Sequence, residues 1–152
     1  MTRGPTIGLE WARRYLGNST PAAVAAMSIS VPNPGVLVIE EDADLGSVLQ
    51  FAVEEAGGVS LGRARDTDET LRSLRNIRPA LIVLDLETER FNGLDIARRL
   101  KADPATRDIP IIAITDFEAK AAEALGSGCD HCLGKPFDLN YLIDHLRPYL
   151  AG

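Results

Sequence analysis

Residues that can bind a cation or a phosphoryl group follow several short apolar segments of this sequence. Glu40 and Glu41 follow the first segment, Asp85 the third, Thr115 the fourth, and Lys135 the fifth. Such segments are typical of strands buried on both faces of a parallel sheet. Because the carboxyl ends of parallel strands meet at one edge, we expect these residues to be neighbours, although they are nearly a hundred positions apart in the chain.

This set of side chains suits phosphoryl transfer to a carboxylate. Clustered carboxylates repel one another, and Mg²⁺ relieves the repulsion by taking oxygen ligands in octahedral geometry. The metal then links the nucleophile to the incoming phosphoryl oxygens. Asp85 as nucleophile would give an acyl phosphate, while Lys135 supplies a positive charge and Thr115 a hydrogen bond.

The elements that must position these residues alternate from Val36 onward. Apolar, β-branched runs indicate strands, and apolar residues at helical spacing behind a capping residue indicate helices. Asp42 and Asp66 are suitable helix caps, a loop through Asn92-Gly93 opens a further helix, and Gly57-Gly58 is a suitable helix end. The expected strands are 36–39, 59–64, 81–84, 109–114 and 130–133, and the expected helices begin near 42, 66, 93, 118 and 138, the last ending near 146.

Five strands alternating with five helices predict an α/β fold, a doubly wound parallel sheet with helices on both faces. Right-handed crossovers leave few topologies. We expect the flavodoxin-like strand order 2-1-3-4-5, whose ligand crevice lies where the first and third strands meet. That crevice is where Asp85 and the Glu40-Glu41 pair would face each other.

Taken together, the motifs resemble the receiver domains of bacterial two-component response regulators (the CheY-like superfamily) in their single-domain form. The resemblance covers about residues 35–150, in the family's order and spacing. Any one motif is weak, but five in sequence are specific. The matching stretches are 36–42, 79–86, 92–94, 109–115 and 128–137.

The resemblance implies a role for each site residue. Asp85 would be the phosphoacceptor, Thr115 the switch hydroxyl, and Lys135 the lysine before a peptide bond to Pro136 that is often cis, as X–Pro bonds can be. The implied Mg²⁺ ligands are Glu40, Glu41, Asp85 and the backbone carbonyl of Glu87.

Three positions depart from the family pattern. Glu41 stands where Asp is usual, and Mg²⁺ is strict about ligand distances. Asp116 stands where a small residue is usual, so it either slows phosphorylation or points outward. Cys132 stands at the aromatic position of the fifth strand, so the usual coupling between the threonine and an aromatic ring cannot operate in its ordinary form.

Composition limits the possible partners. The net charge is −6 and the apolar fraction is 45%, as in an ordinary globular protein. An acidic domain repels a phosphate backbone, so direct nucleic-acid binding is not expected. No apolar run approaches the ~18 residues of a membrane span, so neither a membrane partner nor a secretory signal is expected, and the expected location is cytoplasmic.

Residues 1–34 differ from the rest of the chain. Prolines, glycines and serines interrupt any periodicity, which favours a flexible N-terminal extension before a receiver domain at 35–150. An amphipathic helix over Pro5–Leu16 that docks Trp11 on the domain is the alternative.

Cys129 and Cys132 form a CxxC motif. If the segment is a strand, residues three apart point to opposite faces, so we expect two ordinary thiols.

The expected function is a phosphoacceptor signalling domain of a phosphorelay. A histidine kinase or phosphotransfer protein would be the phosphoryl donor, and the output would be contact with a downstream protein through the fourth helix, fifth strand and fifth helix. It is not expected to be an enzyme beyond catalysing its own phosphorylation and dephosphorylation. The oligomeric state stays open.

Two alternatives remain. A phosphorylation-independent pseudo-receiver, acting as a protein interaction module, is suggested by Glu41, Asp116 and Cys132. A flavodoxin-like enzyme or nucleotide binder is disfavoured because no Gly-rich phosphate loop follows the first strand.

Overall fold

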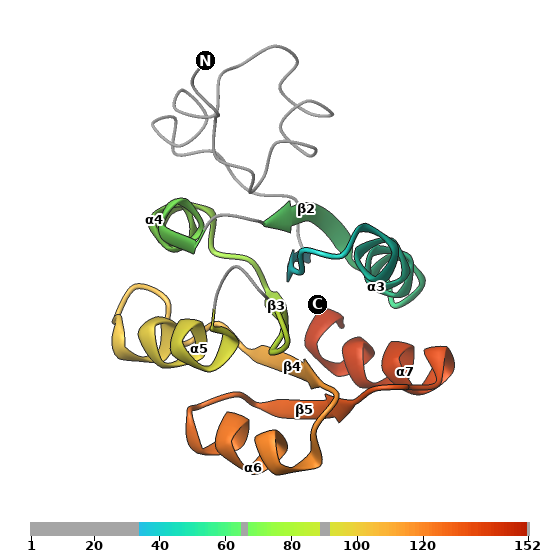
Figure 1. Cartoon of the computed structure of the whole chain (residues 1–152). Helices are drawn as coiled ribbons and strands as arrows, with labels where there is room; N and C mark the ends of the chain where they lie inside the picture. Colours follow the sequence, from blue (N-terminus) through green and yellow to red (C-terminus); the bar gives the residue numbers. More distant parts are fainter. Residues whose placement is uncertain (1–33, 65–66, 89–91, 152) are drawn as a thin grey trace.

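The computed structural model describes residues 34–64, 67–88 and 92–151. These residues form a single parallel sheet in the order β2-β1-β3-β4-β5, with helices on both faces, as predicted (Figure 1). The strands are β1 (Gly35–Ile39), β2 (Val59–Ala64), β3 (Leu81–Asp85), β4 (Ile111–Thr115) and β5 (His131–Gly134). The helices are α3 (Ala43–Glu55), α4 (Thr67–Ile77), α5 (Gly93–Ala102), α6 (Glu118–Gly126) and α7 (Leu139–Leu150).

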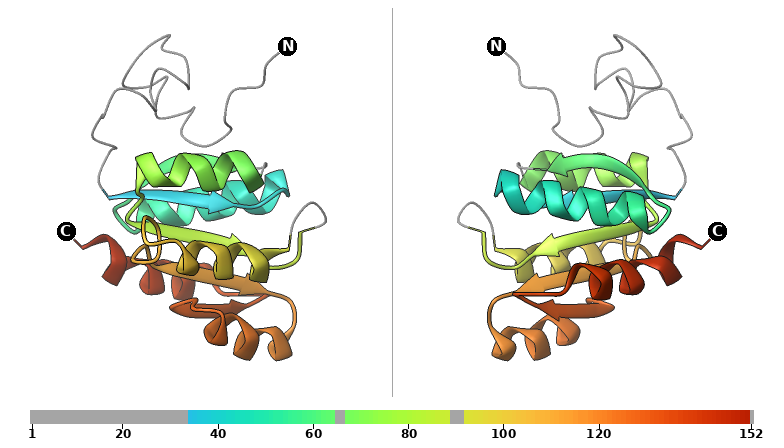
Figure 2. Two further views of the ribbon diagram at one scale, coloured as in Figure 1. Left: turned by 90° about the vertical axis from the view of Figure 1, so that its left-hand side faces the viewer. Right: turned by 90° about the vertical axis from the view of Figure 1, so that its right-hand side faces the viewer.

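Two hydrophobic clusters hold the helices to the sheet. The strands β1, β3 and β4 are fully buried, and alternate residues of each strand point to opposite faces. Leu37 and Ile82 pack with α4, α5 and α6, whereas Val36 and Val83 pack with α3 and α7. Figure 2 shows these layers from both sides. This burial explains why the central strands read as unbroken apolar runs.

Short polar side chains cap the N-termini of three helices. The carboxylate of Asp42 accepts hydrogen bonds from the backbone at the start of α3, and Asp138 does the same for α7. Asn92 accepts one from the Asp95 N–H group at the start of α5. Gly57 follows the end of α3 with φ of 96°, a conformation that glycine adopts without strain. The expected cap at Asp42 is confirmed, and a helix begins after Asn92 as expected.

Two predicted boundaries differ from the structure by two residues or more, whereas the other strand boundaries differ by at most one residue. β4 begins at Ile111 rather than Ile109, because Pro110 has no N–H group to donate to the neighbouring strand. The helix α7 continues to Leu150 with Pro148 inside it, although we expected it to end near residue 146. Pro148 lies in the last turn, where few hydrogen bonds remain to be lost.

The start of β1 and the end of α7 both lie at the amino ends of the strands, opposite the carboxyl ends that carry the site residues. β1 starts at Gly35, and the side chain of Leu150 at the end of α7 lies beside Gly58, directly before β2 begins (Figure 2). Both ends of the described domain are therefore at its amino edge.

Some expectations lie outside the described residues. They are the flexible extension at 1–33, the alternative helix over Pro5–Leu16 and the cap at Asp66. The division into an extension and a domain at 35–150 stays a prediction. Within the described residues, no helix combines the length and apolar character that crossing a membrane requires.

Candidate functional site

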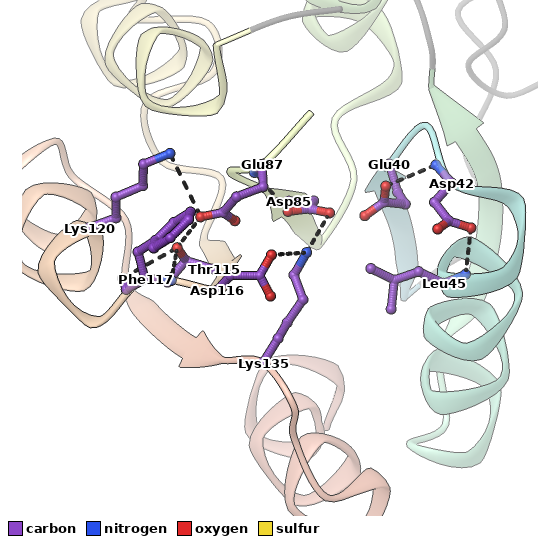
Figure 3. Close-up of polar contacts among 10 residues, drawn as sticks. All are labelled: Glu40, Asp42, Leu45, Asp85, Glu87, Thr115, Asp116, Phe117, Lys120 and Lys135. Carbon is purple, nitrogen blue, oxygen red and sulfur yellow. Dashed lines mark hydrogen bonds and ion pairs between the residues drawn. The ribbon is translucent and has the colours of Figure 1, made fainter. Parts of the chain in front are cut away.

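The carboxyl edge of the sheet brings the predicted site residues together (Figure 3). Asp85 is the last residue of β3 and Thr115 the last of β4, while Glu40 and Lys135 directly follow β1 and β5. Asp85, Thr115 and Glu40 are each at most 2% exposed. Their strands are buried on both faces, so these polar groups are held in place by the register of the sheet.

Lys135 joins the centre of this site to its rim. Its Nζ atom lies 3.0 Å from Asp85 Oδ2 and 3.8 Å from Asp116 Oδ2. Burial works to lower the pKa of Lys135, but the hydrogen bond to Asp85 and the charges of Asp85, Asp116 and Glu40 raise it overall. The ammonium is therefore charged and is shared between a buried carboxylate and an exposed one.

Glu40 and Asp85 form a coupled pair of carboxyl groups. Burial, and then the hydrogen bond with Asp85, raise the pKa of Glu40 to about 8. Burial also opposes ionisation of Asp85, but hydrogen bonds from Glu40, the Glu87 N–H group (2.9 Å) and Lys135 outweigh it and lower the pKa of Asp85. Without a metal, Glu40 holds the proton and Asp85 carries the negative charge.

A magnesium ion fits the groups at this edge. Glu40 Oε2 is buried and accepts no hydrogen bond from an N–H or hydroxyl group of the described residues, and Asp85 is ionised beside it. Mg²⁺ commonly binds through one or two carboxylates, with waters and substrate phosphates completing its shell. Within the described ranges, including this site, no group of three or more His, Cys, Asp or Glu side chains is arranged to hold a metal ion by itself. Glu41 is half-buried, and its role as a ligand stays a prediction.

Thr115 is engaged by a side chain that the sequence analysis did not single out. Its hydroxyl donates a short hydrogen bond to Glu87 Oε1 and accepts one from the Phe117 N–H group at 3.1 Å. Lys120, on the first turns of α6, has its Nζ atom 3.7 Å from the same Glu87 oxygen. We had considered only the backbone carbonyl of Glu87. The available signal was a lysine five residues after Thr115, which is too common a pattern to single out.

The start of α5 packs closely behind Asp85. Gly93 begins α5 directly behind Asp85, and a Cβ atom there would lie 2.9 Å from Leu86 Cα and 3.0 Å from the Asp85 carbonyl oxygen. Only glycine therefore allows this close approach. The peptide bond between Lys135 and Pro136 is cis, as expected.

The two cysteines differ from the expectation in their geometry. Both are free thiols, as expected, but they do not face opposite sides of the sheet. Cys129 lies before β5, where the strand alternation does not apply, and both thiols pack on the hydrophobic cluster under α4, α5 and α6. Burial raises the pKa of Cys129 to about 11, which makes it unreactive. Burial and the charge of Glu87 raise the pKa of Cys132.

Comparison with known proteins agrees with this geometry. The family model described as "Response regulator receiver domain" matches residues 36–147. The polar-differentiation response regulator DivK of Brucella anthropi is 34% identical over 120 residues, which are 78% of this chain and 98% of that protein.

Solved structures share the fold. The signal receiver domain of a signal transduction histidine kinase from Syntrophus aciditrophicus is 28% identical, with a TM-score of 0.69, over 78% of this chain and 91% of that one. The receiver domain of the sensor histidine kinase PA1611 from Pseudomonas aeruginosa is 22% identical, with a TM-score of 0.67, over 78% and 98%. The chain belongs to the response regulator receiver domain family of two-component signalling.

Proposed function

We propose that this receiver domain takes a phosphoryl group on Asp85 with the help of Mg²⁺ and passes the signal on by protein contact. The observation that carries the proposal is the position of Asp85. Its carboxylate is ionised and buried at the end of a central strand, and one of its oxygens lies 3.0 Å from a lysine ammonium. A nucleophile held in this way is ready to meet a phosphoryl group whose charge needs compensation.

Each site residue has a task in this reaction. An oxygen of Asp85 would bond to phosphorus while the bond from phosphorus to the leaving group of the donor breaks. Lys135 would then pair with a phosphoryl oxygen, and the Thr115 hydroxyl would donate to another. Gly93 keeps the backbone of Asp85 in place.

Magnesium would be held by Glu40, Asp85 and the backbone carbonyl of Glu87, with Glu41 nearby in the sequence. When bound, the ion neutralises charge on the phosphoryl oxygens. Support comes from the buried Glu40 oxygen, which accepts no hydrogen bond from an N–H or hydroxyl group of the described residues, and from the PA1611 receiver domain, which was solved with a magnesium ion coordinated in its active-site cleft.

A histidine kinase or phosphotransfer protein is the proposed donor, and a downstream protein the proposed target. The similarity to DivK, itself named a response regulator, supports this. The proposed output surface is α6, β5 and α7, the fourth helix, fifth strand and fifth helix of the domain. The cytoplasmic location and the absence of direct nucleic-acid binding stay predictions.

Intact-protein mass after incubation with acetyl phosphate tests the proposal. We expect a gain of one phosphoryl group that requires Mg²⁺ and is absent from Asp85→Asn. A folded wild-type chain that gains no mass, under conditions that label another receiver domain, would overturn it.

A phosphorylation-independent interaction module is the second candidate. Two contacts favour it: Asp116 shares Lys135 with Asp85, and Glu87 occupies the Thr115 hydroxyl. In that case Asp85→Asn would leave binding to the target unchanged, whereas a phosphoacceptor would lose its regulated binding.

A further inference from the structure

A chain of polar contacts connects the phosphoacceptor edge with α6. Thr115 donates to Glu87 Oε1, and Lys120 Nζ lies 3.7 Å from that same oxygen (Figure 3). Thr115 also accepts from the Phe117 N–H group, and the Lys120 ammonium lies 5.4 Å from the centre of the Phe117 ring. The contacts therefore cover the loop from β4 to α6 and the first turns of that helix.

The hydroxyl of Thr115 cannot serve Glu87 and a phosphoryl group at once. A hydroxyl has a single proton to donate, and in the unphosphorylated chain Glu87 takes it. A phosphoryl group on Asp85 would bring new negative charge close to the Glu87 carboxylate. Like charges repel strongly where water is scarce, so phosphorylation favours separation of Thr115 from Glu87.

The Glu87 carboxylate is only partly compensated. Its Oε2 atom is buried and has no hydrogen-bond partner among the described residues, so Thr115 and Lys120 at Oε1 provide the contacts that hold it. Loss of the Thr115 bond would leave the carboxylate poorly satisfied, because buried polar groups without partners are unfavourable. Glu87 would then have to move, and Lys120 would lose its partner.

The small side chain of Cys132, near Glu87, cannot connect Thr115 with the output surface, so the contacts of Glu87 are left to do so. Cys132 stands at the aromatic position of the fifth strand. Burial is the larger cause of the raised pKa of its thiol, and the nearby charge of Glu87 is the second. No ring is present at that position to follow a movement of Thr115. An acidic side chain that contacts both Thr115 and α6 can supply the missing connection.

We propose that Glu87 is a positioning residue that holds Thr115 and Lys120 in their unphosphorylated arrangement, and that phosphorylation of Asp85 breaks this arrangement and releases the start of α6. This inference rests on the proposed function, because it requires Asp85 to be the phosphoacceptor. It assigns the coupling between site and output surface to the polar contacts Thr115–Glu87–Lys120.

The rate of phosphorylation by acetyl phosphate at saturating Mg²⁺ gives the first test. Glu87→Gln keeps the size of the side chain but removes its charge, so Thr115 is released more easily and the phosphoryl group meets no like charge. We expect labelling about tenfold faster than wild type, since hydrogen bonds to charged groups exceed neutral ones by roughly this factor. Glu123→Gln, an equal charge change at an exposed position of α6, is the control and should match wild type.

Backbone amide NMR signals of α6 report the conformation of this helix, which a variant that changes only the phosphorylation rate would leave unaltered. In wild type, beryllofluoride with Mg²⁺ should shift the signals of Thr115, Phe117 and Lys120. In unphosphorylated Glu87→Gln, and separately in Lys120→Met, the α6 signals should already lie displaced toward the beryllofluoride positions. Lys120→Met keeps the argument testable if the substitution at Glu87 prevents folding.

The outcomes separate this inference from the proposed function. A wild-type chain that neither gains a phosphoryl group nor responds to beryllofluoride overturns both. A wild-type chain that is labelled, with Glu87→Gln and Lys120→Met unchanged in rate and in α6 signals, overturns the positioning role alone. Faster labelling together with displaced α6 signals supports it.

Discussion

Asp116 Oδ2 lies 3.8 Å from the Nζ atom of Lys135, the same ammonium that pairs with Asp85 at 3.0 Å. The Asp116 side chain is 52% exposed, so it turns toward solvent and still contacts the site. The structure therefore shows Asp116 pointing outward while still contacting Lys135, and the possibility that it slows phosphorylation stays a prediction.

Asp116→Asn should speed phosphorylation of Asp85. The substitution leaves Lys135 to Asp85 and the phosphoryl group, but an exposed ion pair contributes only about 0.2–1 kcal/mol, so we expect a gain of between about 1.4-fold and about fivefold. Labelling rates with acetyl phosphate measure it. The difference should shrink at high salt, because salt screens exposed charges. Equal rates at low salt would show that Asp116 leaves Lys135 undisturbed.

Magnesium affinity should rise with pH. Burial and the hydrogen bond to Asp85 raise the pKa of Glu40 to about 8, and a metal must displace this proton to use both Glu40 oxygens. From pH about 5 to about 8 the apparent affinity should increase by up to tenfold per pH unit. Calorimetric titration at several pH values measures the slope. In Glu40→Gln the affinity should be lower and independent of pH over this range.

Stability without metal should change with pH in the opposite direction. Because the folded-state pKa of Glu40 is raised above its ordinary value of 4.5, its stabilising contribution is complete below pH 4.5 and is lost as pH rises through about 8. Urea unfolding of the metal-free chain at pH about 6 and about 8 measures this. Glu40→Gln should flatten the decline, and a wild-type chain equally stable at both values would contradict the shared proton.

Asp42→Ala should destabilise the domain through the start of α3. The Asp42 carboxylate accepts hydrogen bonds from the N–H groups of Asp44 and Leu45 at 2.8 and 3.3 Å. Loss of such a cap costs about 1 kcal/mol. Asp44→Ala is the matched control, since it removes a neighbouring carboxylate that does not cap the helix, and it should cost a few tenths of a kcal/mol. Similar losses for both variants in urea unfolding would refute the cap assignment.

The thiols should react one at a time with a thiol-specific reagent. Cys132 is half-buried, whereas Cys129 is 5% exposed with a pKa raised to about 11, and the thiolate is the reactive form. The native protein should titrate one thiol slowly and the second only after unfolding. Cys132→Ser should abolish the first reaction, and its persistence in that variant would reverse the assignment.

The framework of the domain could be predicted because its signals are local. Apolar runs such as Val36–Ile39 locate buried strands, and a polar residue such as Asp42 ahead of a periodic segment locates a helix start. Parallel strands then require Asp85, Thr115 and Lys135 to share one edge. The prediction failed where a local rule competes with hydrogen bonding, as at Pro110 and Pro148, which shift the ends of β4 and α7.

The electrostatic arrangement within the site could not be predicted. Which carboxyl group of the Glu40 and Asp85 pair keeps the proton depends on burial and on Lys135, fifty positions beyond Asp85. The contact of Glu87 with Thr115 depends on side-chain directions that no spacing rule gives. Cys129 and Cys132 pack on the same hydrophobic cluster, which the alternation rule did not predict, because that rule holds only within a strand and Cys129 lies before β5.

The two ends of the described domain matter for how the protein can be attached or labelled. β1 starts at the amino edge, and Leu150 lies beside Gly58 at that same edge, so the Asp85 edge is on the far side of the sheet (Figure 2). A surface tether or a fluorescent fusion joined behind α7 would leave that edge facing solution. Immobilised sensors and fusion reporters of this domain can therefore be built without obstructing the face on which a phosphoryl donor would have to land.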